Sequence, residues 1–248
     1  MIDIVATKSA IGKCRALISM SANPYILSRN VPAGDLPVNQ ADYLFLIFSR
    51  YSLRALYHAD LFLHNYEKIT CQNLMELAEG QEIGVRVPDH IYFDFDAFVI
   101  SCKSVLESNI IKRAQSLEQR LIPVFLQIAE KAKASLIDPW IKPIRDECAH
   151  LNTFGTSIGS MAWIKLQKDS LIIRLDSNYK TFRGKRAELT ELFNIILDGF
   201  IDICWKVSGI FLAHAFSKYG APQKNICYNH SGFSVQLSEI EIPGFQLK

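Results

Sequence analysis

The stretch from Leu192 to Phe216 constrains the fold more than any other part of the sequence. It is strongly apolar, but it carries Asp198, Asp202 and Lys206 at intervals of four residues. This spacing places the three charges on one face of a helix. Two carboxylates and an ammonium group would be costly inside a lipid bilayer. The stretch therefore predicts a long core helix whose polar stripe faces water or a cleft, and it does not predict a membrane span.

The composition predicts a folded chain with a large core and a modest surface charge. Hydrophobic residues make up 49% of the 248 residues and charged residues 21%, somewhat below the usual quarter. Disorder is therefore not expected over most of the chain, and a second copy is expected to bury some of the surface. The net charge of +2 excludes a protein that coats nucleic acid through its overall field. Any contact with RNA has to come from a local cluster.

The cysteines are scattered, and the sequence contains no CxxC, zinc-type Cys/His block or HExxH pattern. Single thiols fit a reducing compartment. Charges at Asp3, Lys8 and Lys13 interrupt the region where a signal peptide would be apolar. These features predict a cytoplasmic protein with no metal and no cofactor. The cysteines are Cys14, Cys71, Cys102, Cys148, Cys204 and Cys227.

Apolar residues recur with a period of 3.6 over most of the chain, which predicts a mainly α fold. Pro123 lies inside one expected helix and should kink or split it. Asp138-Pro139 combines a cap residue with a first-turn proline, which predicts a new helix start. The helices are expected over residues 41–68, 71–79, from 89 onward, 116–136, 138–152 and 184–219.

Two segments with a period of two predict β-hairpins, over residues 161–175 and 227–242. The second is expected to turn at Asn229 to Gly232, and residues 83–87 predict a short extra strand. The expected organisation is an N-terminal segment over 1–40 without a clear pattern, a helical domain over 41–222 that contains the first hairpin, and a C-terminal hairpin extension over 223–248.

Arg145 and His150 carry the chemistry that stands out most. A histidine can accept and donate a proton near neutral pH, and an arginine binds phosphate oxygens with a forked pair of donors. Cleavage of RNA without a metal needs one group to take the proton from the 2′-hydroxyl and another to neutralise charge on the phosphate. Five residues advance a helix by about 140°, so one helix would not assemble this site, whereas two copies across a dimer interface would.

The segment Arg145-Asp146-Glu147-Cys148-Ala149-His150 resembles the signature of the HEPN superfamily, which is an arginine, a polar residue, three to five further residues and a histidine. Residues 93–107 also look like the HEPN helix that packs beside this motif. The resemblance extends over roughly residues 41–220, with the hairpin at 161–175 as an insertion. It implies a helical bundle that forms a homodimer, with the motif at the dimer cleft.

The resemblance implies a metal-independent endoribonuclease similar to those of prokaryotic toxin and antiviral defence systems. His150 would be the general base, Arg145 would stabilise the transition state, and Asp146 would orient them. The partners implied are a second copy, RNA or a nucleotide, and an antitoxin or regulatory protein, with no membrane.

Two alternatives to the nuclease follow from the same residues. The polar position of active HEPN nucleases is most often asparagine, whereas Asp146 and Glu147 place two negative charges beside the motif, where they also suit a first helical turn. A non-catalytic module that binds a nucleotide, RNA or protein is therefore one alternative. A helical scaffold in which Arg145 and His150 hold the dimer together is the other.

Further candidate residues lie on the two long helices before the motif. Arg50, Arg54 and His58 recur every four residues, which indicates either a ladder of contacts to RNA phosphates or a solvated helix face. Asp94 and Asp96 are interpreted either as acids in a first helical turn or as groups that orient Arg145 or His150 of the partner subunit.

Overall fold

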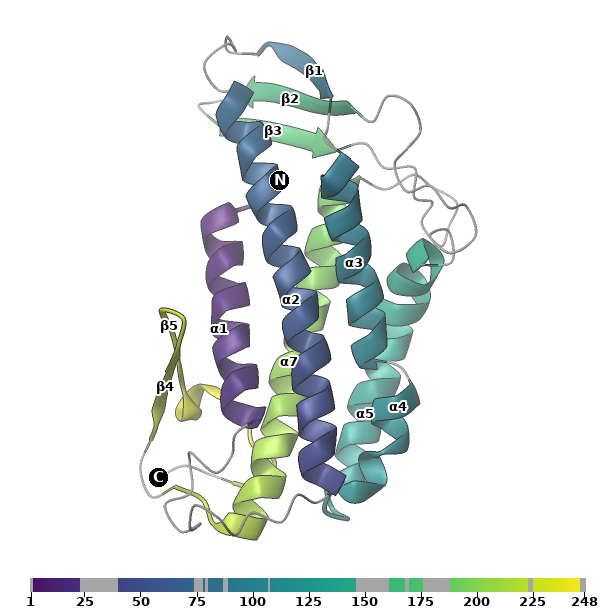
Figure 1. The fold of residues 1–248 in the computed structure, drawn as a ribbon, viewed down its shortest axis with the longest axis vertical. Helices are drawn as coiled ribbons and strands as arrows, with labels where there is room; N and C mark the ends of the chain where they lie inside the picture. Colours follow the sequence, from purple (N-terminus) through teal and green to yellow (C-terminus); the bar gives the residue numbers. More distant parts are fainter. Residues whose placement is uncertain are drawn as a thin grey trace.

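The chain is mainly helical, as the sequence predicts, and its long helices run side by side as a bundle (Figure 1). The computed structural model describes residues 2–22, 40–73, 78, 80–86, 89–106, 108–145, 161–167, 170–175, 188–222 and 225–245. The helices within these ranges are α1 (Ile4–Ala22), α2 (Gln40–Asn73), α3 (Asp89–Leu106), α4 (Ser108–Lys112), η2 (Ala114–Ser116), α5 (Ile122–Ala132), η3 (Lys133–Ile141) and α7 (Leu189–Tyr219).

Helix α1 lies in the N-terminal segment, over which the sequence shows no clear periodicity. It begins with a capping bond, in which the Ala6 N–H donates to Oδ1 of Asp3 over 3.0 Å, and this aspartate is a start signal that sequence reasoning missed. The helix packs on α2 and α7. Arg15 donates to the carbonyl of Leu56 over 2.9 Å and to Asp60 over 3.4 Å. The N-terminal segment is thus part of the bundle.

Buried phenylalanines join α2, α3 and α7 along the centre of the bundle. The Phe62 ring of α2 stacks on Phe193 of α7 with centroids 4.3 Å apart, and Phe98 of α3 contacts Phe193 at 5.5 Å. Further along α7, Phe211 packs against Phe45 at 4.0 Å. Burial of such rings contributes about 1.5–3 kcal/mol each, with a further 0.5–1.5 kcal/mol or so from each favourable ring pair.

The prolines act differently from the sequence prediction. Pro123 does not kink a helix over 116–136, because α5 begins at Ile122 and the proline falls in its first turn, where its missing N–H costs nothing. Pro139 does not start a helix either. It lies inside η3, a π-helical stretch that continues directly from α5. The N–H of Lys142 donates to the carbonyl of Ile137, five residues back, so the wider turn accommodates the proline ring.

Both predicted hairpins are present, and the predicted strand near residue 83 joins the first of them. Strands β1 (Glu82–Arg86), β2 (Met161–Gln167) and β3 (Ser170–Leu175) form an antiparallel sheet in the order β1-β2-β3. Ile164 in the central strand lies opposite Ile83 and Ile173. The sheet covers one end of the bundle (Figure 1). The pairing of β1 with β2 was not predicted because it joins segments far apart in sequence.

The second hairpin consists of β4 (Cys227–His230) and β5 (Phe233–Gln236) and packs against α1. It turns through Ser231 and Gly232, both with positive φ, within the predicted turn. The 3₁₀ turn η4 (Leu237–Glu239) follows. The chain then crosses α7 so closely that a Cβ on Gly209 would meet the carbonyl oxygen of Glu241. Glycine at this position is therefore required by the close approach of two backbones.

Two predicted helix boundaries differ from those observed. Helix α2 continues to Asn73, so the separate short helix expected from residue 71 does not begin there. Helix α7 ends at Tyr219, where Gly220 has φ of 87° and its N–H donates to the carbonyl of Phe216. The helix begins at Leu189 and not at residue 184 as expected, because Glu188 before it is extended. The expected helix end at residue 152 lies outside the described residues. Within the described ranges, no helix combines the length and apolarity needed to cross a membrane.

Substitution of Gly209 by alanine tests the close contact between α7 and the C-terminal segment. We expect Gly209→Ala to lower the free energy of unfolding by about 1–3 kcal/mol, because the added methyl group forces two backbones apart. Gly199→Ala is the matched control on the same helix, since its Cβ would meet only the flexible end of the Leu136 side chain, at 3.0 Å. Urea denaturation of both variants makes the comparison, and equal stabilities would contradict the assigned packing.

Candidate functional site

Arg145 is the last described residue of the helical segment that follows η3. Residues 142–145 return to α-helical geometry after η3. Ile141 and Ile144 are fully buried and hold this segment in the bundle, where η3 packs on α3 and α7. The side chain of Arg145 is half-buried. The predicted helical position of the motif arginine is therefore confirmed.

The other motif residues, Asp146 and His150, lie outside the described residues, as does Cys148. Their assembly with Arg145 remains a prediction from the sequence. The chain re-enters the described part at Met161, where β2 begins. In the sequence, the motif thus lies between the described helical residues 142–145 and the central strand of the sheet.

Asp94 and Asp96 do not fall in the first turn of a helix, because α3 begins at Asp89. The interpretation as first-turn acids is therefore wrong. Asp94 is half-buried and accepts a hydrogen bond of 2.8 Å from Nδ2 of Asn65 on α2. Asp96 is only 7% exposed. Asp94 thus points to the seam between α2 and α3, whereas Asp96 is enclosed by the bundle.

Arg50, Arg54 and His58 lie along α2, but the three do not form one uniform ladder. Arg50 and Arg54 are exposed, and neither makes a hydrogen bond or an ion pair within the described structure. Four residues advance a helix by about 400°, so His58 is turned by roughly 80° from Arg50. This rotation brings His58 toward α3, where it is half-buried. The two arginines alone are available to a solvent-borne ligand.

His58 is held as a neutral imidazole by its surroundings. Its Nδ1 atom is shielded from water and has no hydrogen-bond partner among the described residues. Burial lowers the pKa of His58; the carboxylate of Asp94 opposes this effect and the nearby Arg54 adds to it. A phosphate-binding role for His58 is therefore weaker than the sequence spacing indicates.

The polar stripe of α7 faces water, in agreement with the favoured prediction. Asp198 and Asp202 are exposed, and Lys206 forms an ion pair with Asp202 one turn away. Partial burial raises the pKa of Asp198. The other faces of the helix are almost entirely buried. The stripe is a solvated helix face.

The buried cysteines and His214 have structural roles. A hydrogen bond with Cys204, together with burial, holds the pKa of Cys14 well above its usual range, and burial does the same for Cys102. These thiols therefore stay protonated and unreactive. His214 accepts the N–H of Glu118 at Nδ1 over 3.1 Å and meets the ring of Phe45 edge-on. These contacts give His214 a structural role in the packing of α2 and α7.

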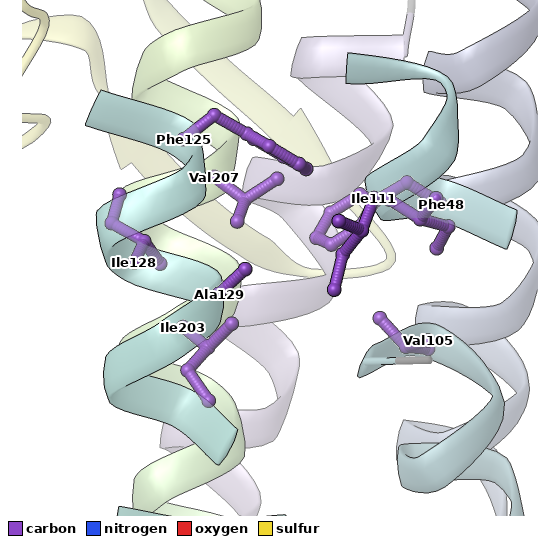
Figure 2. A pocket seen from close by; sticks show the side chains of 9 residues that line it. Phe48, Val105, Ile111, Phe125, Ile128, Ala129, Ile203 and Val207 are labelled. Carbon is purple, nitrogen blue, oxygen red and sulfur yellow. The ribbon is translucent and has the colours of Figure 1, made fainter. Parts of the chain in front are cut away.

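A small hollow lies between α2, α5 and α7, and sequence reasoning gave no sign of it (Figure 2). Its empty volume is about 330 Å³, part of which is open to solvent. The lining is wholly apolar and includes Phe48, Phe125 and Val207. A site without a polar group can neither orient a substrate nor move a proton. The hollow therefore does not have the groups of a catalytic pocket.

No group of histidine, cysteine and carboxylate side chains capable of holding a metal occurs in the described part of the chain. Comparison of the chain with family models, with curated proteins and with solved structures found no match. The functional interpretation therefore depends on the residues themselves.

The burial of His58 predicts a pH-dependent stability. The unfolded chain binds a proton at His58 more readily than the folded chain, so the stabilising contribution is present above the unfolded pKa, near 6.5, and is lost as the pH falls below it. We expect the melting temperature of the parent to fall more steeply between pH 7.5 and 5 than that of His58→Gln. Scanning calorimetry across this range makes the measurement, with His64→Gln, an exposed histidine of the same helix, as the control. Parallel profiles of parent and His58→Gln would refute the assignment.

Proposed function

We propose that the chain is a HEPN-type, metal-independent endoribonuclease that acts as a homodimer. The observation that carries the proposal is the motif at residues 145–150, whose arginine leaves the core on a helix fixed by Ile141 and Ile144. A phosphate ligand gains most from an arginine whose backbone is rigid, because little ordering is then required on binding. Because five residues advance a helix by about 140°, Arg145 and His150 would not meet on one helix, and a second copy of the motif would be needed to complete the cleft.

The reaction proposed is an intramolecular transfer at phosphorus. The 2′-hydroxyl oxygen of RNA forms a bond to phosphorus as His150 removes its proton. The bond from phosphorus to the 5′-oxygen breaks, and that oxygen takes a proton from an imidazolium or from water. Arg145 neutralises the charge that develops on the other phosphate oxygens, and Asp146 orients the pair. The products are a 2′,3′-cyclic phosphate and a 5′-hydroxyl end.

The sequence beside the motif favours a second candidate function. Asp146 and Glu147 replace the common asparagine and its neighbour with two carboxylates, which repel a polyanion. A non-catalytic module that binds a nucleotide, RNA or an antitoxin-like protein in the same cleft would tolerate them. We place this function second because the Arg145 and His150 side chains are suited to phosphodiester cleavage.

Cleavage of RNA in the presence of EDTA tests the proposed activity. We expect the parent protein to cut a 5′-labelled single-stranded RNA without added metal and to leave the matching DNA, which lacks the 2′-hydroxyl, intact. Arg145→Ala and His150→Ala should each lower the rate by about 10²- to 10⁴-fold, the usual contribution of such groups. Mass spectrometry of the product ends checks for the cyclic phosphate.

Two matched variants control for the loss of a cation and of an imidazole. Lys142→Ala removes an exposed charge one turn before Arg145, and His230→Ala removes a half-buried histidine on β4. Both should cleave like the parent. Cleavage that survives in His150→Ala would refute the proposed mechanism. Absence of cleavage, combined with nucleotide-induced thermal stabilisation that Arg145→Ala weakens, would support the binding module instead.

A further inference from the structure

We infer that the outward side of α2 is a docking site for single-stranded RNA, separate from the motif at 145–150. This surface, the α2 outer face, consists of Tyr43, Leu46, Arg50, Arg54, Tyr57 and His64, all of them exposed. It extends for about 32 Å along the helix. In Figure 1, α2 lies at the front of the bundle, between α1 and α3, and no described helix or strand is drawn in front of it. The inference rests on the proposed function, because it adds a substrate-binding surface to it.

The charges on α2 are sorted between two sides of the helix. The acids Asp60 and Glu67 face α1, where they pair with Arg15 and Lys8. On α3, Asp94 accepts a hydrogen bond from Asn65, and its negative charge acts on His58. Arg50 and Arg54 therefore remain as cations without a described partner, and no acid is among the described exposed side chains that make up this surface. Such a surface is complementary to a chain of phosphates.

Exposed aromatic rings flank the pair of arginines, one on each side along the helix. Tyr57 is 55% exposed and Tyr43 is 48% exposed, and each lies two turns from Arg50 along the helix. Arg113 lies over the Tyr43 ring at 4.7 Å from its centroid, which adds a third cation at this end. Rings interleaved with arginines are the combination that binds single strands, since bases stack on the rings while the guanidinium groups hold the backbone.

A second copy of the chain fits this surface less well than RNA does. Two-fold pairing of α2 with itself would bring Arg50 and Arg54 of both subunits to one interface without a described acid to neutralise them. Juxtaposed like charges oppose association. The exposed tyrosine rings would suit either a protein or RNA, so they do not distinguish between the two partners. The positive charge of the two arginines does distinguish them, and it favours RNA.

The position of the α2 outer face separates docking from cleavage. Helix α3 contacts both α2 and η3 and lies between them. Since Arg145 follows η3, RNA on the α2 outer face is bound at a distance from the phosphate that is cut. Loss of this face should therefore raise the RNA concentration needed for half-maximal cleavage and leave the rate at saturating RNA unchanged.

Fluorescence anisotropy with a labelled uridine oligomer of about 12 nucleotides, long enough to span such a surface, tests the inference. The oligomer carries 2′-O-methyl groups, so it is bound but not cut. We expect Arg50→Gln/Arg54→Gln to weaken binding and to reduce the slope of log affinity against log salt by about 1.4, which corresponds to two lost phosphate contacts. Tyr57→Leu should weaken binding by roughly 5- to 100-fold with the slope unchanged.

The matched control is Lys131→Gln/Lys133→Gln, which removes two exposed cations from α5 and η3 and should bind like the parent. The inference is overturned if the parent does not bind the oligomer, or if the two double variants behave alike. It is also overturned if light scattering shows that the arginine variant loses its dimer while RNA binding is kept, since the face would then hold a second copy. Binding of the oligomer without any cleavage of RNA would refute the proposed nuclease and leave the docking site standing.

Discussion

The stacking of phenylalanines between α2, α3 and α7 is the contact on which the rest of the structure depends. Phe62, Phe98 and Phe193 meet within ring-contact distance, and each comes from a different long helix. Because these rings fix the rotation of α2 about its own axis, they also decide which residues point outward. The arginines and tyrosines of α2 are exposed because the phenylalanines occupy the opposite, buried side of the helix.

The same principle applies to the segment that carries Arg145. A proline inside a helix would normally break it, at a cost of about 3 kcal/mol. Here the wider π turn at η3 keeps the chain helical, while Leu136, Ile137 and Ile141 stay buried. Burial of three large side chains offsets the cost of the irregular turn. The direction in which Arg145 leaves the bundle is thus set by core packing and by one proline together.

The long helices and both hairpins could be predicted from the sequence because their periodicity is strong and local. The π turn could not, since local rules read Asp138-Pro139 as a helix start and only the packing of its neighbours overrides them. Helix α1 was missed because Gly12 and scattered polar residues weaken its pattern. Gly12 is there for a non-local reason: a Cβ at this position would meet the ring of Phe233.

In the candidate site, too, local features could be predicted from the sequence, and features that depend on packing between helices could not. The helical position of Arg145 followed from local signals. The loss of His58 from the arginine ladder did not, because it depends on α3 lying against the side of α2 that carries His58. The sequence also identified Asp94 and Asp96 as notable but placed them in a first turn, since the seam formed by Asn65 and Asp94 exists only once α2 and α3 pack together.

Pairing of β1 with β2 gives the sheet a property that a lone hairpin would lack. Ile164 is fully buried, while its neighbour Trp163 is 39% exposed. A slip of β2 by one residue would exchange the two, so that an indole would have to enter a space filled by an isoleucine. The alternation therefore excludes a shift of β2 by an odd number of residues. Because β2 is paired on both edges, such a slip would break its pairing with β1 as well as with β3.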